Sequence, residues 1–177
     1  MQSLSQSKNQ ILTWTKRKGR HYELTLGNAV YADMRWDSAF GSRAIGSAAE
    51  GQWAIARAGV LHQTITAHQL NRGVDSATLQ YYRYGVSSLQ LMDGMIYHRS
   101  ATGQRLREQG FFTAGCELVC GWTLRTNWTH LEAGVRIAPG QEQCRDLSLL
   151  VLLGWYCLVM EYDDDTEAAA AACFAVL

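Results

Sequence analysis

The sequence has one proline, Pro139, and its five cysteines include no pair with C-x-x-C spacing. The first residues, MQSLSQSKNQILTW, lack the basic start and apolar core of a secretory signal. An odd number of cysteines without such a signal is typical of reduced thiols in the cytosol. Cys116 and Cys120 in CELVC fall on one face of an expected strand, but small buried residues explain this spacing better than zinc ligands do. We therefore predict a cytoplasmic protein with no disulfide, no bound metal and no cofactor.

Charged residues are absent between Leu147 and Met160, a run of 14 residues that follows Arg145 and Asp146 and precedes Glu161. A membrane span needs about 20 apolar helical residues, whereas a run of about 10–14 is more often a buried helix. A helix lying on a membrane surface would need a charged face, but leucine and valine point in every direction along this run. We predict a helix enclosed by the protein, with membrane insertion as the main alternative. A single-pass anchor is not expected, because the run would extend only roughly 21 Å.

Basic residues are absent after Arg145. Residues 1–145 hold all 16 Lys and Arg with 10 of the 16 acids, so this part carries a net charge of +6 and the remainder −6. The asymmetry indicates either an anionic partner for the first part or a basic barrel surface beside an acidic tail, and the second interpretation is favoured. Because the whole chain is neutral and basic and aromatic residues do not alternate in a stripe, nucleic acid is not predicted as a partner.

Before residue 141 the chain reads as about ten to twelve short β-type runs separated by turn dipeptides. In HYELTLGNAVYADMRW, Tyr22, Leu24 and Leu26 alternate with polar residues, and Gly27-Asn28 supplies a tight turn. A sheet of so many strands must close or split, because exposed edges promote aggregation. A closed barrel of that size has a lumen too wide for its own side chains to fill. The pattern therefore predicts a mainly β fold of ten to twelve antiparallel strands, and if the sheet closes into a barrel the apolar C-terminal helix can fill its lumen.

Three segments follow from this pattern. Residues 1–10 are expected to be a flexible N-terminus, and residues 11–162 to form the barrel with its central helix at 146–161. Residues 163–177 are acidic and then rich in alanine, which is typical of either a short second helix or a frayed tail.

The chain resembles the tubby-like barrel superfamily, in particular its LURP-one-related and phospholipid-scramblase-like members. The stretches that carry the resemblance are KRKGRHYELTLGNAVYADMRW, EGQWAIAR, LQLMDGMIYHR and LSLLVLLGWYCLVM. The resemblance implies a mainly β fold, a closed antiparallel barrel of about twelve strands around the C-terminal apolar helix, and a non-catalytic role in binding or scaffolding.

Two departures limit what the resemblance implies about function. The proline-rich N-terminal region and the cysteine clusters of scramblase-like proteins are missing, and YDDDTEAAAAAC lacks the loop glycine and the distal acid of a calcium loop. Lipid scrambling is therefore not implied. Binding of phosphoinositide headgroups, associated with the tubby branch, is implied only in general terms.

The densest basic run is TKRKGRHY, which contains Lys16, Arg17, Lys18 and Arg20. Such a run can hold phosphates through lysine charge and bidentate arginine contacts. It is also typical of a solvated strand whose lysines discourage aggregation. Alternation along a strand would place Lys16, Lys18 and Arg20 on one face and Arg17 on the other. These four residues are the predicted anion-binding site, for an anionic lipid headgroup or another phosphorylated ligand; a protein partner is the other possibility.

Motifs of enzymes are missing: the sequence contains no nucleophile elbow, phosphate loop or zinc-ligand pair. His62 and His68 lie at even spacing in one expected strand and are more typical of a surface pair than of a site. The acids Asp33, Asp93, Glu117 and Glu132 are candidates for paired carboxylates. The sequence therefore favours a non-catalytic binding or scaffold module, and the alternative is a small hydrolase with carboxylates at the barrel mouth.

Overall fold

The computed structural model describes residues 1–7, 10–39, 41–59, 63–71, 74–82, 86–101, 108–127 and 130–174. These residues form a short 3₁₀ helix, η1 (Leu4–Gln6), twelve β-strands and one long α-helix, α1 (Leu147–Phe174). The strands in chain order are β1 (Ile11–Lys16), β2 (His21–Leu26), β3 (Ala29–Trp36), β4 (Arg43–Ala48), β5 (Gly51–Ala58), β6 (Gln63–Gln69), β7 (Val74–Tyr81), β8 (Ser87–Leu91), β9 (Ile96–Ala101), β10 (Glu108–Thr113), β11 (Leu118–Asn127) and β12 (His130–Ile137).

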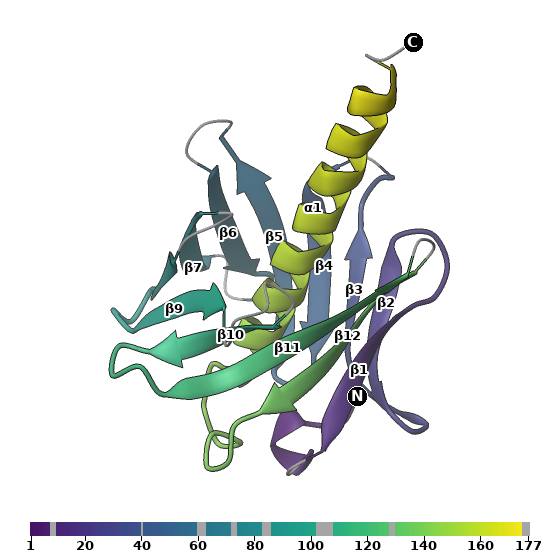
Figure 1. The fold of residues 1–177 in the computed structure, drawn as a ribbon. Coiled ribbons are helices and arrows are strands. Elements are labelled where there is room, and N and C mark those ends of the chain that lie inside the picture. The colour runs from purple at the N-terminus through teal and green to yellow at the C-terminus, as the bar shows by residue number, and fades with distance from the viewer. Residues whose placement is uncertain are drawn as a thin grey trace.

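The strands form a closed antiparallel barrel. Each strand pairs with the next one along the chain, and β12 returns to pair with β1, with Ile11 opposite Arg136. Closure gives every strand two hydrogen-bonded neighbours, so the backbone groups of the first and last strands are satisfied by each other. The predicted closed barrel around the apolar C-terminal helix is confirmed (Figure 1).

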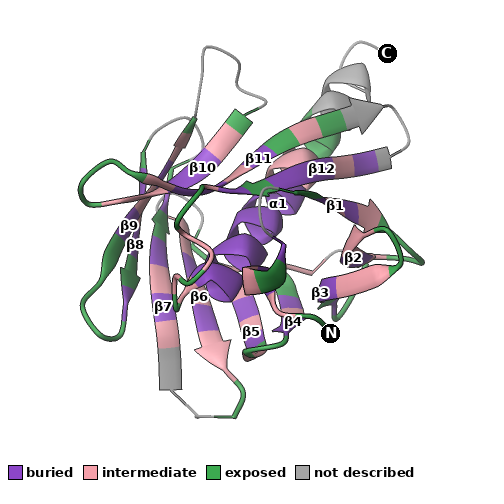
Figure 2. Ribbon diagram, turned by 90° about the horizontal axis from the view of Figure 1, so that it is seen from below, coloured by how far each residue is buried: buried purple, intermediate pink, exposed green. Residues whose placement is uncertain are grey.

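Alternation along the strands sets which side chains face the lumen. In β1, Leu12 and Trp14 are buried while their neighbours are partly or fully exposed, and in β5 Trp53 and Ile55 follow the same pattern. Successive side chains of a strand point to opposite faces of the sheet, so buried and exposed positions alternate along the ribbon (Figure 2). The predicted β2–β3 hairpin is present, and Gly27 takes the positive φ of 57° in its turn.

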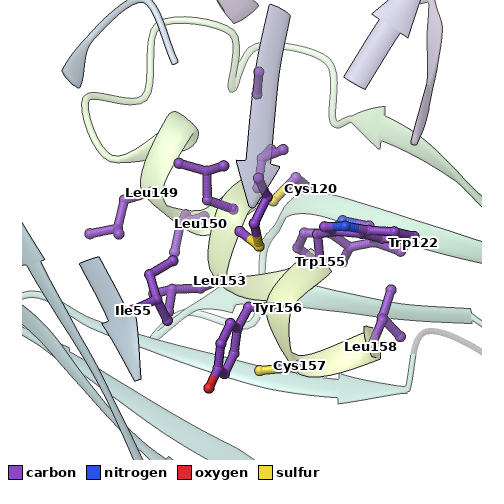
Figure 3. Close-up of a cluster of buried hydrophobic side chains, with 14 of the residues drawn as sticks. Ile55, Cys120, Trp122, Leu149, Leu150, Leu153, Trp155, Tyr156, Cys157 and Leu158 are labelled. Carbon is purple, nitrogen blue, oxygen red and sulfur yellow. The ribbon is translucent and has the colours of Figure 1, made fainter. Parts of the chain in front are cut away.

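The first half of α1 fills the lumen. Residues 147–160 are all buried, and they belong to one core cluster with side chains of the strands, such as Ile55 of β5 and Trp122 of β11 (Figure 3). The ring of Trp155 stacks on that of Trp14 with centroids 5.2 Å apart, and the ring of Tyr156 stacks on that of Trp36 at 5.8 Å. An apolar helix can thus bury every face, because its backbone N–H and C=O groups form hydrogen bonds with one another. Among the described residues, we find no helix with an apolar stretch long enough to cross a membrane.

Gly154 lies where α1 passes closest to the barrel wall. A Cβ atom at this position would overlap the indole ring of Trp122, whose side chain is itself fully buried. Glycine normally weakens the middle of a helix by about 1 kcal/mol relative to alanine. Here it is required by packing, because only a residue without a side chain lets Trp122 lie against the helix.

The predicted end of the central helix is wrong. Helix α1 begins at Leu147 and continues without a break through Asp163 to Phe174, so residues 163–174 form neither a second helix nor a frayed tail. The helix continues because arginines of the barrel pair with its acidic turn, as described below. Within residues 1–10, which are predicted to be flexible, Leu4 is buried in the core and the Gln2 amide donates to the Val30 carbonyl at 2.9 Å.

Candidate functional site

The two open ends of the barrel differ, because α1 enters at one and leaves at the other (Figure 1). The N-terminal mouth is the end where α1 begins, beside the β4–β5 and β8–β9 turns. The C-terminal mouth is the end where α1 emerges, beside the β1–β2 turn and the β3–β4 connection. Hairpin turns alternate between the two ends of an antiparallel meander, so the predicted cationic run lies at the C-terminal mouth.

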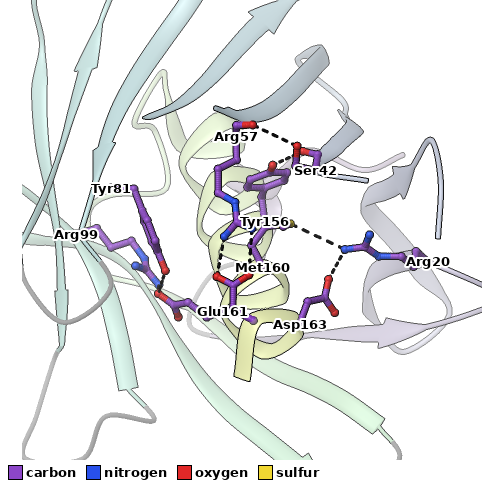
Figure 4. A network of polar contacts seen from close by, with 10 residues as sticks. Arg20, Ser42, Arg57, Tyr81, Arg99, Tyr156, Met160, Glu161 and Asp163 are labelled. Carbon is purple, nitrogen blue, oxygen red and sulfur yellow. Dashed lines mark hydrogen bonds and ion pairs between the residues drawn. The ribbon is translucent and has the colours of Figure 1, made fainter. Parts of the chain in front are cut away.

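Three arginines at the C-terminal mouth pair with three acidic residues in one turn of α1 (Figure 4). The arginines come from the residue just before β2, the end of β5 and the middle of β9. The ion pairs are Arg20–Asp163, Arg57–Asp164 and Arg99–Glu161. Part of the charge asymmetry of the sequence is therefore neutralised within the molecule, where acidic residues of α1 form ion pairs with arginines of the barrel.

The most buried of these pairs is Arg99–Glu161. The side chains are only 4% and 13% exposed, and their N–O distance is 2.9 Å. Glu161 also accepts hydrogen bonds from the Tyr81 hydroxyl at 2.7 Å and from the Gln109 amide at 3.3 Å. Burial raises the pKa of Tyr81 far above its usual range, and the charge and hydrogen bond of Glu161 raise this pKa further. The phenol therefore stays protonated and keeps donating to the carboxylate.

Arg57 binds Asp164 through two parallel hydrogen bonds of 2.7 and 3.0 Å. The hydrogen bond with Asp164 raises the pKa of Arg57 although burial opposes this rise. A bidentate pair fixes both distance and orientation, so it sets the depth and rotation of α1 in the barrel. The sequence contains a pattern that could have indicated this role. Arg57 follows Trp53 and Ile55 at a spacing of two residues, so strand alternation places all three side chains on the lumen face.

Arg20 makes its polar contacts within the molecule. Besides Asp163, its guanidinium donates to the Ala39 carbonyl at 3.2 Å and to the Gly41 carbonyl at 2.8 Å. It also lies 4.8 Å from the centre of the Trp36 ring. The prediction that Arg20 shares a binding face with the two lysines is therefore wrong, because its donors are used to join β2, the β3–β4 connection and α1.

The other three cations of the run remain at the surface. Strand β1 ends at Lys16, and the chain then turns, with Gly19 at a positive φ of 63°. The alternation predicted for a continuous strand is therefore wrong beyond Lys16. Lys16, Arg17 and Lys18 are all exposed. Arg17 contacts Glu23 at 2.7 Å, so the turn offers two lysines and one partly neutralised arginine.

Asp163 should make stability depend on pH. Burial raises its pKa above the usual 3.8, Arg20 opposes this rise, and Glu167 and Asp164 add to it. The folded protein thus binds a proton at the Asp163 carboxyl more tightly than the unfolded chain does. This proton binding stabilises the fold fully below pH 3.8, and the stabilisation is lost as the pH rises through the raised pKa. Lowering the pH from about 7 to about 4 should therefore stabilise the wild type relative to Asp163→Asn. Thermal unfolding followed by circular dichroism measures the Tm of both proteins across this pH range. Parallel curves of Tm against pH for the wild type and Asp163→Asn would contradict the prediction.

The remaining candidate residues do not form one site. Cys116 lies exposed in the β10–β11 turn with a φ of 64°, whereas Cys120 is buried in β11, so they do not share a strand face. His68 lies in β6, and His62 is outside the described residues. The four acids predicted as possible pairs lie on separate elements: Asp33 in β3, Asp93 in the β8–β9 turn, Glu117 in the β10–β11 turn and Glu132 in β12. Within the described parts of the chain, no group of three or more His, Cys, Asp or Glu residues could hold a metal ion.

A cleft of about 300 Å³ opens at the N-terminal mouth, beside the first turn of α1. Three carboxylates line it, from Glu50, Asp93 and Asp146. Glu50 accepts hydrogen bonds from the hydroxyls of Ser3 at 2.6 Å and of Ser148. The sequence analysis missed this grouping, because the three acids come from elements that only barrel closure brings together.

Fold and surface together define a closed β-barrel protein with a helix in its lumen and a different charged surface at each mouth. Comparisons of the chain with protein-family models, with curated proteins and with solved structures give no match. The resemblance to tubby-like barrels therefore stays a prediction.

Proposed function

We propose that the protein is a non-catalytic binding module of the tubby-like type, which holds an anionic headgroup or another phosphorylated ligand at the β1–β2 turn. The observation that carries this proposal is the exposure of three neighbouring cations, Lys16, Arg17 and Lys18, at the rim of the C-terminal mouth. Lysine and arginine side chains at the surface can hold a phosphate; Lys16 ends β1, and Arg17 and Lys18 follow it in the turn.

A filled lumen supports a role at the surface. The large side chains of α1 occupy the space that a wide barrel would otherwise offer to a ligand. A ligand must therefore bind at a mouth or on the outer wall. At the C-terminal mouth, Arg20, Arg57 and Arg99 already pair with α1, which leaves the β1–β2 turn to contact an anion.

The carboxylates at the N-terminal mouth make a hydrolase the second candidate. Catalysis by two carboxylates needs an acid and a base that are free to exchange protons with a substrate. Here Asp146 accepts from the Tyr97 hydroxyl at 3.1 Å, and Asp93 forms an ion pair with Arg145 at 3.3 Å. Contacts that hold each acid in a structural role favour binding over catalysis.

Liposome co-sedimentation tests the proposed ligand class. The wild type should sediment with vesicles that contain phosphoinositide and not with neutral phosphatidylcholine vesicles. Each lysine near an anionic membrane contributes about 1 kcal/mol, so Lys16→Ala/Lys18→Ala should bind roughly thirtyfold more weakly. Binding should also fall as salt rises, because exposed charges are screened over about 8 Å at physiological ionic strength.

Arg136→Ala is the matched control, because Arg136 is an exposed arginine near the other end of the barrel. It should bind like the wild type. Competition by soluble inositol trisphosphate distinguishes the sources of phosphate: displacement at low concentration indicates headgroup recognition, whereas no displacement indicates attraction to the charged membrane. Equal sedimentation with neutral and anionic vesicles, or unchanged binding of the double variant, would refute the proposal.

A further inference from the structure

The cleft at the N-terminal mouth continues into two neighbouring clefts. One, of about 290 Å³, shares Glu50, Arg145 and Ser148 with it and extends toward the N-terminal residues of the chain. The other, of about 220 Å³, shares Leu91 and Met92 and extends along β7 and β8. We call the three together the mouth groove. Its lining runs from Ser3 and Leu4, past the first turn of α1, to β7 and β8, and this spread suits an extended chain.

Acidic side chains dominate the charge of the mouth groove. Among the described residues that line it, Arg145 is the only base, against the carboxylates of Glu50, Asp93, Asp146 and Glu142. Arg145 contacts Asp93 at 3.3 Å and Asp146 at 4.0 Å. The N-terminal end of α1 adds a partial positive charge of about half a unit. The groove therefore stays negative and complements a cationic partner.

Apolar side chains border the same groove. Trp53, Leu91 and Leu149 line its floor, and Met92 stands at the junction of two clefts with 69% of its surface exposed. Met95 and Ile96, which follow in the same β8–β9 hairpin, are also exposed. Methionine adapts its shape to different partners and is frequent at binding surfaces. An apolar border beside carboxylates matches a ligand that presents both a hydrocarbon surface and a positive charge.

We propose that the mouth groove binds an extended peptide segment of a partner protein, in which a lysine or arginine is flanked by large apolar residues. The basic side chain lies between Asp93 and Glu50, with its methylene stem on Trp53, and the apolar neighbours pack against Met92 and Leu91. Lysine and arginine commonly bury their stems on apolar surface while their charge stays near water or a carboxylate. This role is independent of the β1–β2 turn, which lies at the opposite mouth.

A random-peptide array, probed with the labelled full chain, tests the proposal. Bound peptides should be enriched in lysine or arginine next to leucine, methionine, phenylalanine or tryptophan. The best peptide, made synthetically with a fluorescein label, is then titrated with the wild type and with Asp93→Asn and Met92→Ser. Each substitution should weaken binding by roughly fivefold or more. The Asp93 carboxylate accepts a hydrogen bond from the Met95 amide at 3.2 Å, and an amide oxygen can accept the same bond, so Asp93→Asn removes charge and keeps the turn.

Lys16→Ala/Lys18→Ala is the control and should bind the peptide like the wild type, because it changes only the other mouth. Both groove substitutions are at exposed side chains, and circular dichroism checks that the variants are folded. No enrichment on the array, enrichment of acidic peptides, or unchanged affinity of Asp93→Asn and Met92→Ser would overturn the proposal. Dimerisation of the wild type that Met92→Ser abolishes would also overturn it, since the groove would then bind a second copy of the chain.

Discussion

Gly154→Ala is expected to destabilise the protein by about 3 kcal/mol, the upper part of the range for overpacked cores. At an exposed helix position the same change would stabilise by about 1 kcal/mol. The sign reverses because the new methyl group would overlap the indole ring of Trp122, which is itself buried in the core. For a domain of this size the midpoint of thermal unfolding should fall by roughly 6–12 °C.

Two variants show whether the overlap is the cause. Gly115→Ala lies in the exposed β10–β11 turn, where a Cβ would meet only the Thr113 hydroxyl at 3.7 Å, and should change stability by less than about 0.5 kcal/mol. Trp122→Phe removes part of the ring that the methyl would contact, so the double variant Gly154→Ala/Trp122→Phe should lose less than the sum of the single losses. A Gly154→Ala protein that is as stable as the wild type would contradict the packing of α1 against β11.

Glu161→Gln should destabilise the protein by about 3–5 kcal/mol, because it leaves the buried charge of Arg99 without a carboxylate. The guanidinium is only 4% exposed, so water cannot replace the lost partner. A neutral amide still accepts a hydrogen bond but no longer balances the charge. Urea unfolding followed by tryptophan fluorescence measures the loss of free energy.

Glu23→Gln is the matched control, because it breaks the Arg17–Glu23 pair, in which the arginine is 52% exposed. Exposed ion pairs contribute about 0–1 kcal/mol, so this variant should unfold close to the wild type. Arg99→Met/Glu161→Gln removes both charges and should recover most of the stability, since replacing both members of a buried pair with neutral groups is often neutral. If Glu161→Gln and Glu23→Gln lost the same free energy of unfolding, water would have to reach the Arg99–Glu161 pair.

Several features of the fold were predictable from local patterns. The alternation of Tyr22 and Leu24 with polar neighbours and the Gly27-Asn28 turn indicate a hairpin, and repetition of this pattern without helical segments indicates an antiparallel sheet. The uncharged run from Leu147 to Met160 indicates an enclosed helix. These inferences are confirmed because each depends on neighbours in sequence, or on the requirement that apolar surface and strand edges be covered.

The end of α1 was not predictable in the same way. Asp163 to Asp165 after an apolar run are ordinarily typical of a helix boundary, because carboxylates favour the start of a helix and not its continuation. The helix continues because Arg20 and Arg57, more than 100 positions earlier, supply the opposite charges. The same pairing directs Arg20 toward α1, whereas Lys16, Arg17 and Lys18 are exposed.

The mouth groove depends on tertiary structure even more strongly. Glu50, Asp93 and Asp146 are far apart in the chain, and each has an ordinary local role in or next to a turn or at a helix start. They line one cleft because the barrel closes and the helix enters at that mouth. Sequence periodicity shows which face of an element a residue occupies, since that depends on local backbone geometry. The distance between residues of different elements depends on strand order, register and closure, and only the folded barrel sets these.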